Sequence, residues 1–212
     1  MVPVVLAISR QIASGGAYIG QAVARSLNLR YVDREILIRA AADLGVDEQH
    51  VGAYEERAAS FWSTIGRGLF AGAPDAPFVR PPLLGIQEGE VLEAERRVIR
   101  DTAERDDCVI VGRGAPYLIR KDHPGVVRLF VHAALEYRVA EARRAYDLDE
   151  KAALELIRAS DRRRSQFVQA LVGRPWGDAC LFDLSVDTST VGLDTAIALV
   201  ERVVRDRIDA RQ

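Results

Sequence analysis

Short apolar runs rich in valine and isoleucine alternate along this chain with segments of helical composition, and this alternation limits the folds it can adopt. The apolar runs predict strands at residues 3–9, 29–32, 108–112, 126–132 and 181–188. The segments between and after them predict helices at about 16–27, 34–44, 90–105, 136–146, 149–171 and 192–206. Parallel strands need crossover connections, which helices supply. The sequence therefore predicts an α/β domain with a parallel sheet and helices on both faces.

One part of the chain does not fit this alternation. Residues 71–89 are rich in proline and glycine, so they predict a long loop or flap rather than a regular element. Phe61, Trp62, Leu69 and Phe70 shortly precede it and are apolar. We interpret these four residues either as core or as a contact between two copies of the chain, which would make a homodimer.

The bulk composition points to a single water-soluble domain. The chain has 212 residues, and its 29 basic and 31 acidic residues nearly cancel. No apolar stretch approaches the roughly 18 residues that span a bilayer, and no signal peptide is recognisable, so we expect a cytoplasmic protein with no membrane partner. Cys108 and Cys180 adjoin predicted strands, where we expect buried thiols rather than a disulfide. Three scattered histidines predict no metal cluster, and we assign no metal ligand.

A glycine pair separates the first predicted strand from the first predicted helix, in the stretch ISRQIASGGAYIG (8–20). Such a loop directs backbone N–H groups into one hollow at the positive end of a helix, which suits an anion. In the phosphate-loop pattern G-x-x-x-x-G-K-[ST], Gly15 matches the second glycine, Gly16 replaces the lysine and Ala17 replaces the hydroxyl. Arg10 replaces the first glycine and can supply the missing positive charge. The alternative is a plain structural turn.

Several motifs carry a resemblance to one family. ISRQIASGG, followed by LNLRYVDREIL, resembles the start of the cytidylate kinase-like family, which opens with Ile-Ser-Arg, a Gly-Ser-Gly-Gly loop and a Tyr-x-Asp-x-Glu segment. The resemblance recurs at CVIVGRGA (108–115), at SDRRRSQF (160–167) and at GRPWGDACLFDLSVDTS (173–189). The chain departs from the family at Ala13, in place of the first loop glycine, and at Ala17, where many members have arginine. Gly114 follows Arg113 where true cytidylate kinases carry an aspartate.

This resemblance implies a fold and an activity. The fold would be the three-layer P-loop NTPase fold, with a five-stranded parallel sheet in a single kinase domain spanning residues 1–212. A monophosphate-binding insertion would occupy about 36–105 and a basic helical lid about 138–166. The activity would be transfer of the γ-phosphoryl group of ATP, with Mg²⁺, to a nucleoside monophosphate, with CMP or dCMP as the leading acceptor and no nucleic acid polymer as partner.

The missing loop lysine leaves two other hypotheses open. One is a nucleotide-binding regulatory protein that kept the fold and lost phosphoryl transfer. The other is a kinase for a non-nucleotide acceptor, with a differently shaped pocket formed by residues 71–89.

Phosphoryl transfer needs cations around the migrating charge, so the resemblance draws attention to arginines. The residues expected to hold the donor phosphates are Ser9, Arg10, Ser14, Gly15, Gly16 and Ala17. Those expected to stabilise the transferring charge are Arg10, Arg138, Arg143, Arg162 and Arg164. Arg113 would hold the acceptor phosphate, Asp161 would orient an arginine, and Asp33 would orient the substrate or a metal-bound water. The alternatives are a surface ion pair for Arg113, solvated helix faces for the arginine runs, and a helix cap for Asp33.

Two further stretches, on either side of the last predicted strand, contain candidate functional residues. Trp176, Gly177 and Asp178 are interpreted as the turn into that strand, with the indole packed inside, and the alternative is a contact with the substrate. Asp187, Thr188 and Ser189 follow the strand, where the backbone frames the adenine in related kinases.

Overall fold

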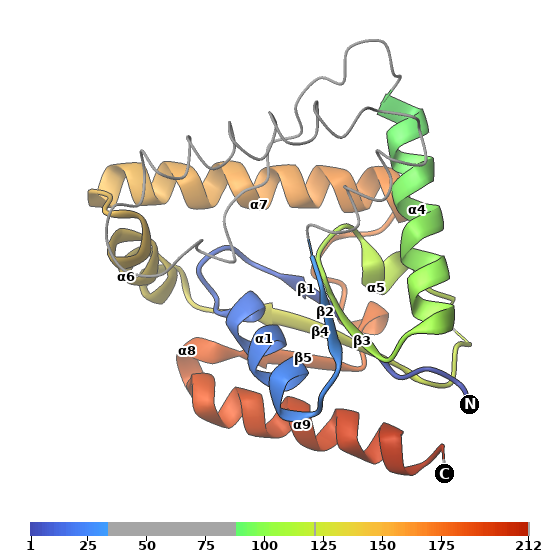
Figure 1. The fold of residues 1–212 in the computed structure, drawn as a ribbon. Coiled ribbons are helices and arrows are strands. Elements are labelled where there is room, and N and C mark those ends of the chain that lie inside the picture. The colour runs from blue at the N-terminus through green and yellow to red at the C-terminus, as the bar shows by residue number, and fades with distance from the viewer. Residues whose placement is uncertain (34–87, 121, 212) are drawn as a thin grey trace, which may run out of the picture.

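The structure is a computed structural model that describes residues 1–33, 88–120 and 122–211 (Figure 1). The expected helix at 34–44, the expected loop up to residue 87 and the apolar residues Phe61, Trp62, Leu69 and Phe70 lie outside these ranges. The strands are β1 (Val5–Arg10), β2 (Arg30–Val32), β3 (Cys108–Val111), β4 (Val126–His132) and β5 (Leu184–Asp187). The helices are α1 (Gly16–Ser26), α4 (Glu88–Arg105), α5 (Ala115–Leu118), α6 (Leu135–Tyr146), α7 (Glu150–Val172), α8 (Thr188–Val191) and α9 (Leu193–Asp209).

The strands form one five-stranded sheet in the order β2-β3-β1-β4-β5, and every pair in it is parallel. β1 lies at the centre, where Val5 is level with Cys108 on β3 and with Val126 on β4. The fold class predicted from the sequence is therefore confirmed. Because the strands are parallel, the loops that follow β1, β3, β4 and β5 meet at one edge of the sheet, the edge where such folds bind ligands.

Helices cover both faces of this sheet, as Figure 1 shows. Successive residues of β1 point to opposite faces, so Leu6 and Ile8 pack under α1 and α9, whereas Val5 and Ala7 pack under α4 and α5. Each of these β1 residues is fully buried. Double burial explains why the central strands read as continuous apolar runs rather than as alternating ones.

The structure differs from the sequence-based expectation in the stretch before β5. Residues Ala179–Leu181 form a 3₁₀ turn, because the Asp178 carboxylate accepts the backbone N–H of Cys180 at 3.0 Å and starts the turn there. Cys180 is consequently exposed, and the prediction that it is buried was wrong, while Cys108 is buried as expected. Both thiols are free.

Two short helices, α5 and α8, were not predicted. A buried arginine from the sheet stabilises the end of α5: Arg128 Nε donates to the carbonyl of Pro116 at 3.1 Å, and its Nη2 donates to those of Ile119 and Arg120 at 3.3 and 2.6 Å. Burial lowers the pKa of Arg128. These contacts join residues distant in the sequence, so local composition gave no sign of them. None of the helices described is long and apolar enough to cross a membrane.

The last residues of the chain are fastened to the edge of the sheet opposite the binding edge. Arg211 donates to both carboxylate oxygens of Asp107, at 2.5 and 2.7 Å, and that carboxylate also accepts the N–H of Val4 at 2.8 Å. The hydrogen bond from Arg211 is the largest cause that lowers the pKa of Asp107. The pair therefore contributes stability above the pKa of an unfolded aspartate, and this contribution is lost as the pH falls through the folded value.

We expect Arg211→Gln to lower the free energy of unfolding at pH 7 by about 0.5–1 kcal/mol, since the pair is partly exposed. The difference from the wild type should shrink as the pH falls below the ordinary aspartate pKa of about 3.9, because the carboxyl is protonated first in the unfolded chain and, at lower pH, in the folded protein. Urea titrations at pH 7, 5 and 3 measure this, with Arg205→Gln on the exposed side of α9 as control. A difference that persists undiminished at pH 3 would contradict the assignment to the Asp107 charge.

Candidate functional site

The loop between β1 and α1 has a backbone suited to an anion. Ala13 and Gly15 both adopt left-handed conformations, at φ 58° and 79°, while α1 begins at Gly16. Left-handed residues alternating with right-handed ones turn successive N–H groups toward one concavity, and the first turn of a helix leaves its own N–H groups without intrahelical partners. The loop is therefore built for an anion at its mouth. Ala13 holds a conformation that costs a non-glycine residue about 1 kcal/mol.

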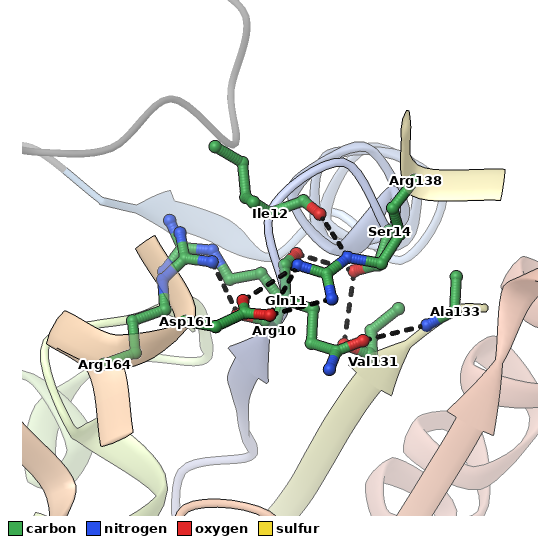
Figure 2. Close-up of polar contacts among 9 residues, drawn as sticks. All are labelled: Arg10, Gln11, Ile12, Ser14, Val131, Ala133, Arg138, Asp161 and Arg164. Carbon is green, nitrogen blue, oxygen red and sulfur yellow. Dashed lines mark hydrogen bonds and ion pairs between the residues drawn. The ribbon is translucent and has the colours of Figure 1, made fainter. Parts of the chain in front are cut away.

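The side chain of Ser14 does not face this concavity. Its Oγ is buried and lies within hydrogen-bond distance of the carbonyls of Gln11, at 2.8 Å, and Val131, at 3.2 Å. The side-chain Oε1 of Gln11 in turn accepts a hydrogen bond from the backbone N–H of Ala133 at 3.1 Å (Figure 2). The loop is thereby fixed to the end of β4, and its interaction with an anion would come from backbone N–H groups, not from the serine hydroxyl.

The segment after β5 is fastened to the same loop. Thr188 Oγ1 donates to the carbonyl of Ser14 at 2.8 Å and lies 3.2 Å from that of His132. Asp187 starts α8 by accepting the N–H of Ser189, and the hydroxyl of Ser189 also donates to it, which lowers the pKa of Asp187. Thr188 thus fastens the segment after β5 to the loop. The expected position of Asp187, Thr188 and Ser189 around an adenine stays a prediction.

Arg138 on α6 is almost fully buried and is bound within the protein. Its Nε donates to the carbonyl of Ile12 at 2.9 Å, and its Nη atoms pair with both carboxylate oxygens of Asp161 on α7 at 2.8–2.9 Å (Figure 2). Arg164, one turn further along α7, donates to the carbonyl of Arg10 at 2.9 Å. The structure thus brings Asp161 to an arginine, as expected. It also gives Arg138 a contact with the loop backbone, and the expected role of Arg138 beside the transferring charge stays a prediction.

The side chain of Ile12 anchors α6 and α7 to the loop. It is fully buried, in a cluster with Ala142 and Tyr146 of α6 and Ala153 and Ile157 of α7. The helices expected to form the lid therefore pack directly against the loop in the described structure.

Arg10 connects the loop to the turn after β3. A Cβ on Gly112 would lie 2.1 Å from Arg10 Nη1, so the guanidinium rests against the backbone of that turn. A Cβ on Gly16 would lie 2.5 Å from Arg10 Cβ and 3.3 Å from Val131 Cβ. The base of the arginine side chain thus fills the space in which a lysine at position 16 would begin.

Arg113 lies in that same turn, with φ 55°, and its Nη1 is 3.3 Å from Glu95 Oε1 on α4. Glu95 is 1% exposed and had not been singled out from the sequence. Its signal was nevertheless present, since Glu95 shares a helical face with the buried residues Val98, Ile99 and Thr102. A buried carboxylate needs partners, and Arg113 is one of them.

Ser9 and Trp176 meet behind the loop. Trp176 Nε1 donates to Ser9 Oγ at 2.9 Å, and the indole packs edge-on against Phe130 in an aromatic cluster that includes Phe182. Both Ser9 and Trp176 are buried. The interpretation of Trp176 as a packed residue of the turn agrees with this position, and the Ser9 hydroxyl is occupied inside the protein.

The remaining expected residues are more scattered. Arg143 and Arg162 are exposed on α6 and α7. Asp33 follows β2, the edge strand next to β3. Ala17 is buried and has no side-chain oxygen. Among residues 1–33, 88–120 and 122–211, no three histidine, cysteine, aspartate or glutamate side chains lie close enough to hold a metal ion. The backbone of the loop fits an anion such as a phosphate.

Comparison with solved structures identifies the same architecture elsewhere. An uncharacterized protein from Eubacterium ventriosum is similar with a TM-score of 0.68 and 18% identity, covering 95% of this chain and 98% of that one. Shikimate kinase from Bacteroides thetaiotaomicron is similar with a TM-score of 0.50 and 13% identity, covering 95% and 98%. At these identities the likeness concerns the fold, which is that of the P-loop kinases.

Comparison with curated proteins gave no match to the sequence. The sequence model of the cytidylate kinase-like family matches residues 5–190, which contain the loop, the turn after β3, the helices α6 and α7 and the last strand. This chain belongs to the cytidylate kinase-like family.

Proposed function

We propose that this protein is an ATP-dependent nucleoside monophosphate kinase, with CMP or dCMP as the leading acceptor. The observation that carries the proposal is the position of Arg10, which ends β1 at the loop and lays its guanidinium against Gly112 in the turn after β3. In this arrangement one cation lies between the loop that would hold the donor phosphates and the turn that would hold the acceptor through Arg113. Family membership supports the same reaction.

The proposed reaction needs positioning and positive charge rather than a nucleophilic side chain. The bond between the γ-phosphorus and the oxygen bridging it to the β-phosphate breaks, and a bond forms to an oxygen of the acceptor phosphate. The products are ADP and a nucleoside diphosphate. Because the attacking oxygen is already anionic, no general base is required. Arg10, Arg143, Arg162 and Arg164 would stabilise the charge that moves between the two phosphates. The charge of Arg138 is already taken up by Asp161, so we leave it out of this set.

Mg²⁺ is expected to enter with ATP. The described side chains offer it no cluster of ligands, so the nucleotide phosphates and water would supply most of them. No step proposed here depends on a protein ligand to the metal.

The turnover test uses purified full-length protein with ATP, Mg²⁺ and each nucleoside monophosphate in turn. We expect ADP and the matching diphosphate in equal amounts with CMP or dCMP, measured by chromatography, and slower reaction with the other monophosphates. Turnover with a non-nucleotide acceptor, and with no nucleoside monophosphate, would contradict the nucleotide assignment. It would favour the hypothesis of a kinase for a non-nucleotide acceptor.

A second candidate function is nucleotide binding without phosphoryl transfer. It is favoured by Gly16 and the buried Ala17, which stand where a phosphate loop has its lysine and its hydroxyl. ATP binding with no turnover of any acceptor would establish this alternative over the kinase.

Arg10 and Asp33 should differ sharply in importance. We expect Arg10→Ala to lower kcat by roughly a hundredfold, the loss typical of removing one group that stabilises a transition-state charge. Asp33→Asn should have a much smaller effect, because Asp33 follows the edge strand β2. Steady-state kinetics measure both, with Arg25→Ala on the exposed side of α1 as control. Equal losses in the two variants would contradict the assignment of the missing lysine's charge to Arg10.

Restoring the lysine should not restore a standard phosphate loop. Because its Cβ would collide with Arg10 Cβ, we expect Gly16→Lys to lower the free energy of unfolding by about 1–3 kcal/mol, and to lower ATP affinity as well. Gly177→Lys is the matched control, since a Cβ there meets no atom within 4 Å, and it should change stability by less than about 0.5 kcal/mol. Urea unfolding and ATP titration measure the two effects. A stable Gly16→Lys variant with tighter ATP binding would contradict the steric argument.

A further inference from the structure

We propose that Arg138, held in place by Asp161, is a positioning residue that sets the backbone of the loop at residues 11–15 to receive an anion. The inference rests on the proposed function, because it assigns a task within the donor site of that reaction. It begins from the direction in which the loop carbonyls point.

Most carbonyls of this loop have hydrogen-bond donors within the protein. The acceptor and donor pairs are Arg10 O with Arg164 Nη1, Gln11 O with Ser14 Oγ, Ile12 O with Arg138 Nε, Ser14 O with Thr188 Oγ1, and Gly15 O with the N–H of Ile19. Their distances lie between 2.8 and 2.9 Å. A carbonyl oxygen turned toward a bound phosphate would repel it. Donors that hold these oxygens in other directions therefore prevent that repulsion.

The same contacts fix the opposite side of each peptide. In a planar trans peptide the C=O of one residue and the N–H of the next point in opposite directions. When Arg138 holds the carbonyl of Ile12, the N–H of Ala13 is directed away from Arg138. When Thr188 holds the carbonyl of Ser14, the N–H of Gly15 is likewise directed away from Thr188. Side chains outside the loop thereby aim two of its N–H groups.

Arg138 acts on the peptide where the backbone is strained. The Ile12–Ala13 peptide precedes the left-handed Ala13, at φ 58°, a conformation that persists only where its surroundings impose it. Asp161 engages the guanidinium with both of its oxygens, which fixes the plane of the fork and leaves Nε aimed at the Ile12 carbonyl. The Ile12 side chain is itself fully buried against α6 and α7. The peptide is therefore held at both its side chain and its carbonyl.

This task matters more in a loop without a lysine. With Gly16 in the lysine position, more of the binding energy for the donor phosphates must come from backbone N–H groups. Such groups bind an anion well only if they are already aimed before it arrives. Arg138 and Asp161 would supply that preorganisation without touching the ligand.

The experiment measures binding of inorganic tripolyphosphate, and separately of ATP, to the full chain by isothermal titration calorimetry. Arg138→Lys keeps a positive charge but loses the planar fork, so it cannot serve Asp161 and the Ile12 carbonyl together. Asp161→Asn keeps the arginine and removes the charge that holds its plane. We expect the Kd of both anions to rise about tenfold or more in each variant. The matched control is Arg144→Lys, an exposed arginine on the same helix paired with Glu141.

Kinetics separate positioning from general damage to the fold. If the wild type turns over monophosphates, the KM for ATP should rise in both variants while the KM for the acceptor stays unchanged. If Arg138→Lys does not fold, the anion affinities and KM values of Asp161→Asn test the positioning role. Unchanged anion affinity in a folded Asp161→Asn variant would overturn the inference.

The outcomes also distinguish this inference from the proposed function. Weakened tripolyphosphate binding in the variants, together with no turnover of any monophosphate by the wild type, would support the positioning role and reject the kinase. Failure of the wild type to bind either anion would overturn both.

Discussion

The approach of the Arg10 side chain to two glycine backbones constrains the whole binding edge. A Cβ at position 16 would meet Arg10 Cβ, and a Cβ at position 112 would meet its guanidinium. The residue types at 10, 16 and 112 are therefore coupled, although they lie on β1, on α1 and after β3. In a standard phosphate loop the cation comes from the first turn of the helix. Here a cation comes from the end of the strand, and it points toward the next strand along the sheet.

Helix α7 connects the two halves of this edge. Asp161 contacts the loop indirectly, through Arg138, and Arg164 binds the carbonyl of Arg10. Phe167 and Leu171 lie against Gly114, since a Cβ on that glycine would meet their side chains first. These four residues follow one another at helical spacing, so they form one stripe along the helix. The same stripe thus contacts both the loop after β1 and the turn after β3. Burial of Arg138 in this region would be unfavourable by itself, and the two-sided pair with Asp161 together with the Ile12 carbonyl offsets its desolvation.

The sheet, the central loop and the family were accessible from sequence because each depends on local pattern. Continuous apolar runs predicted doubly buried strands, and Gly15 and Gly16 marked the strand-to-helix turn. The partners of the site were not accessible, because they depend on which distant segments meet. The sequence indicated that Asp161 would orient an arginine but did not identify that arginine as Arg138, and it gave no sign of the carbonyls that Arg128 binds at the end of α5. Glu95 is the exception, because its burial could have been predicted: it lies at helical spacing from the buried residues Val98 and Ile99. For Cys180 the sequence pattern was misleading. Its position next to a predicted strand suggested burial, but the turn that Asp178 caps leaves the thiol exposed.

Backbone strain also distinguishes this edge from the rest of the described chain. The non-glycine residues with left-handed φ among residues 1–33, 88–120 and 122–211 are Ala13, Asn28, Arg113 and Asp147. Asn28 lies just beyond α1 and Asp147 at the end of α6, and asparagine and aspartate adopt this conformation readily at helix ends. Alanine and arginine do not adopt this conformation readily, and Ala13 and Arg113 occupy the loop after β1 and the turn after β3. Each is held by contacts from elsewhere, Ala13 through its Ile12 neighbour and Arg113 through the buried Glu95. Conformations that cost free energy and are imposed by distant residues cluster where binding requires a set geometry, which is the physical reason to look for bound ligands at these two turns.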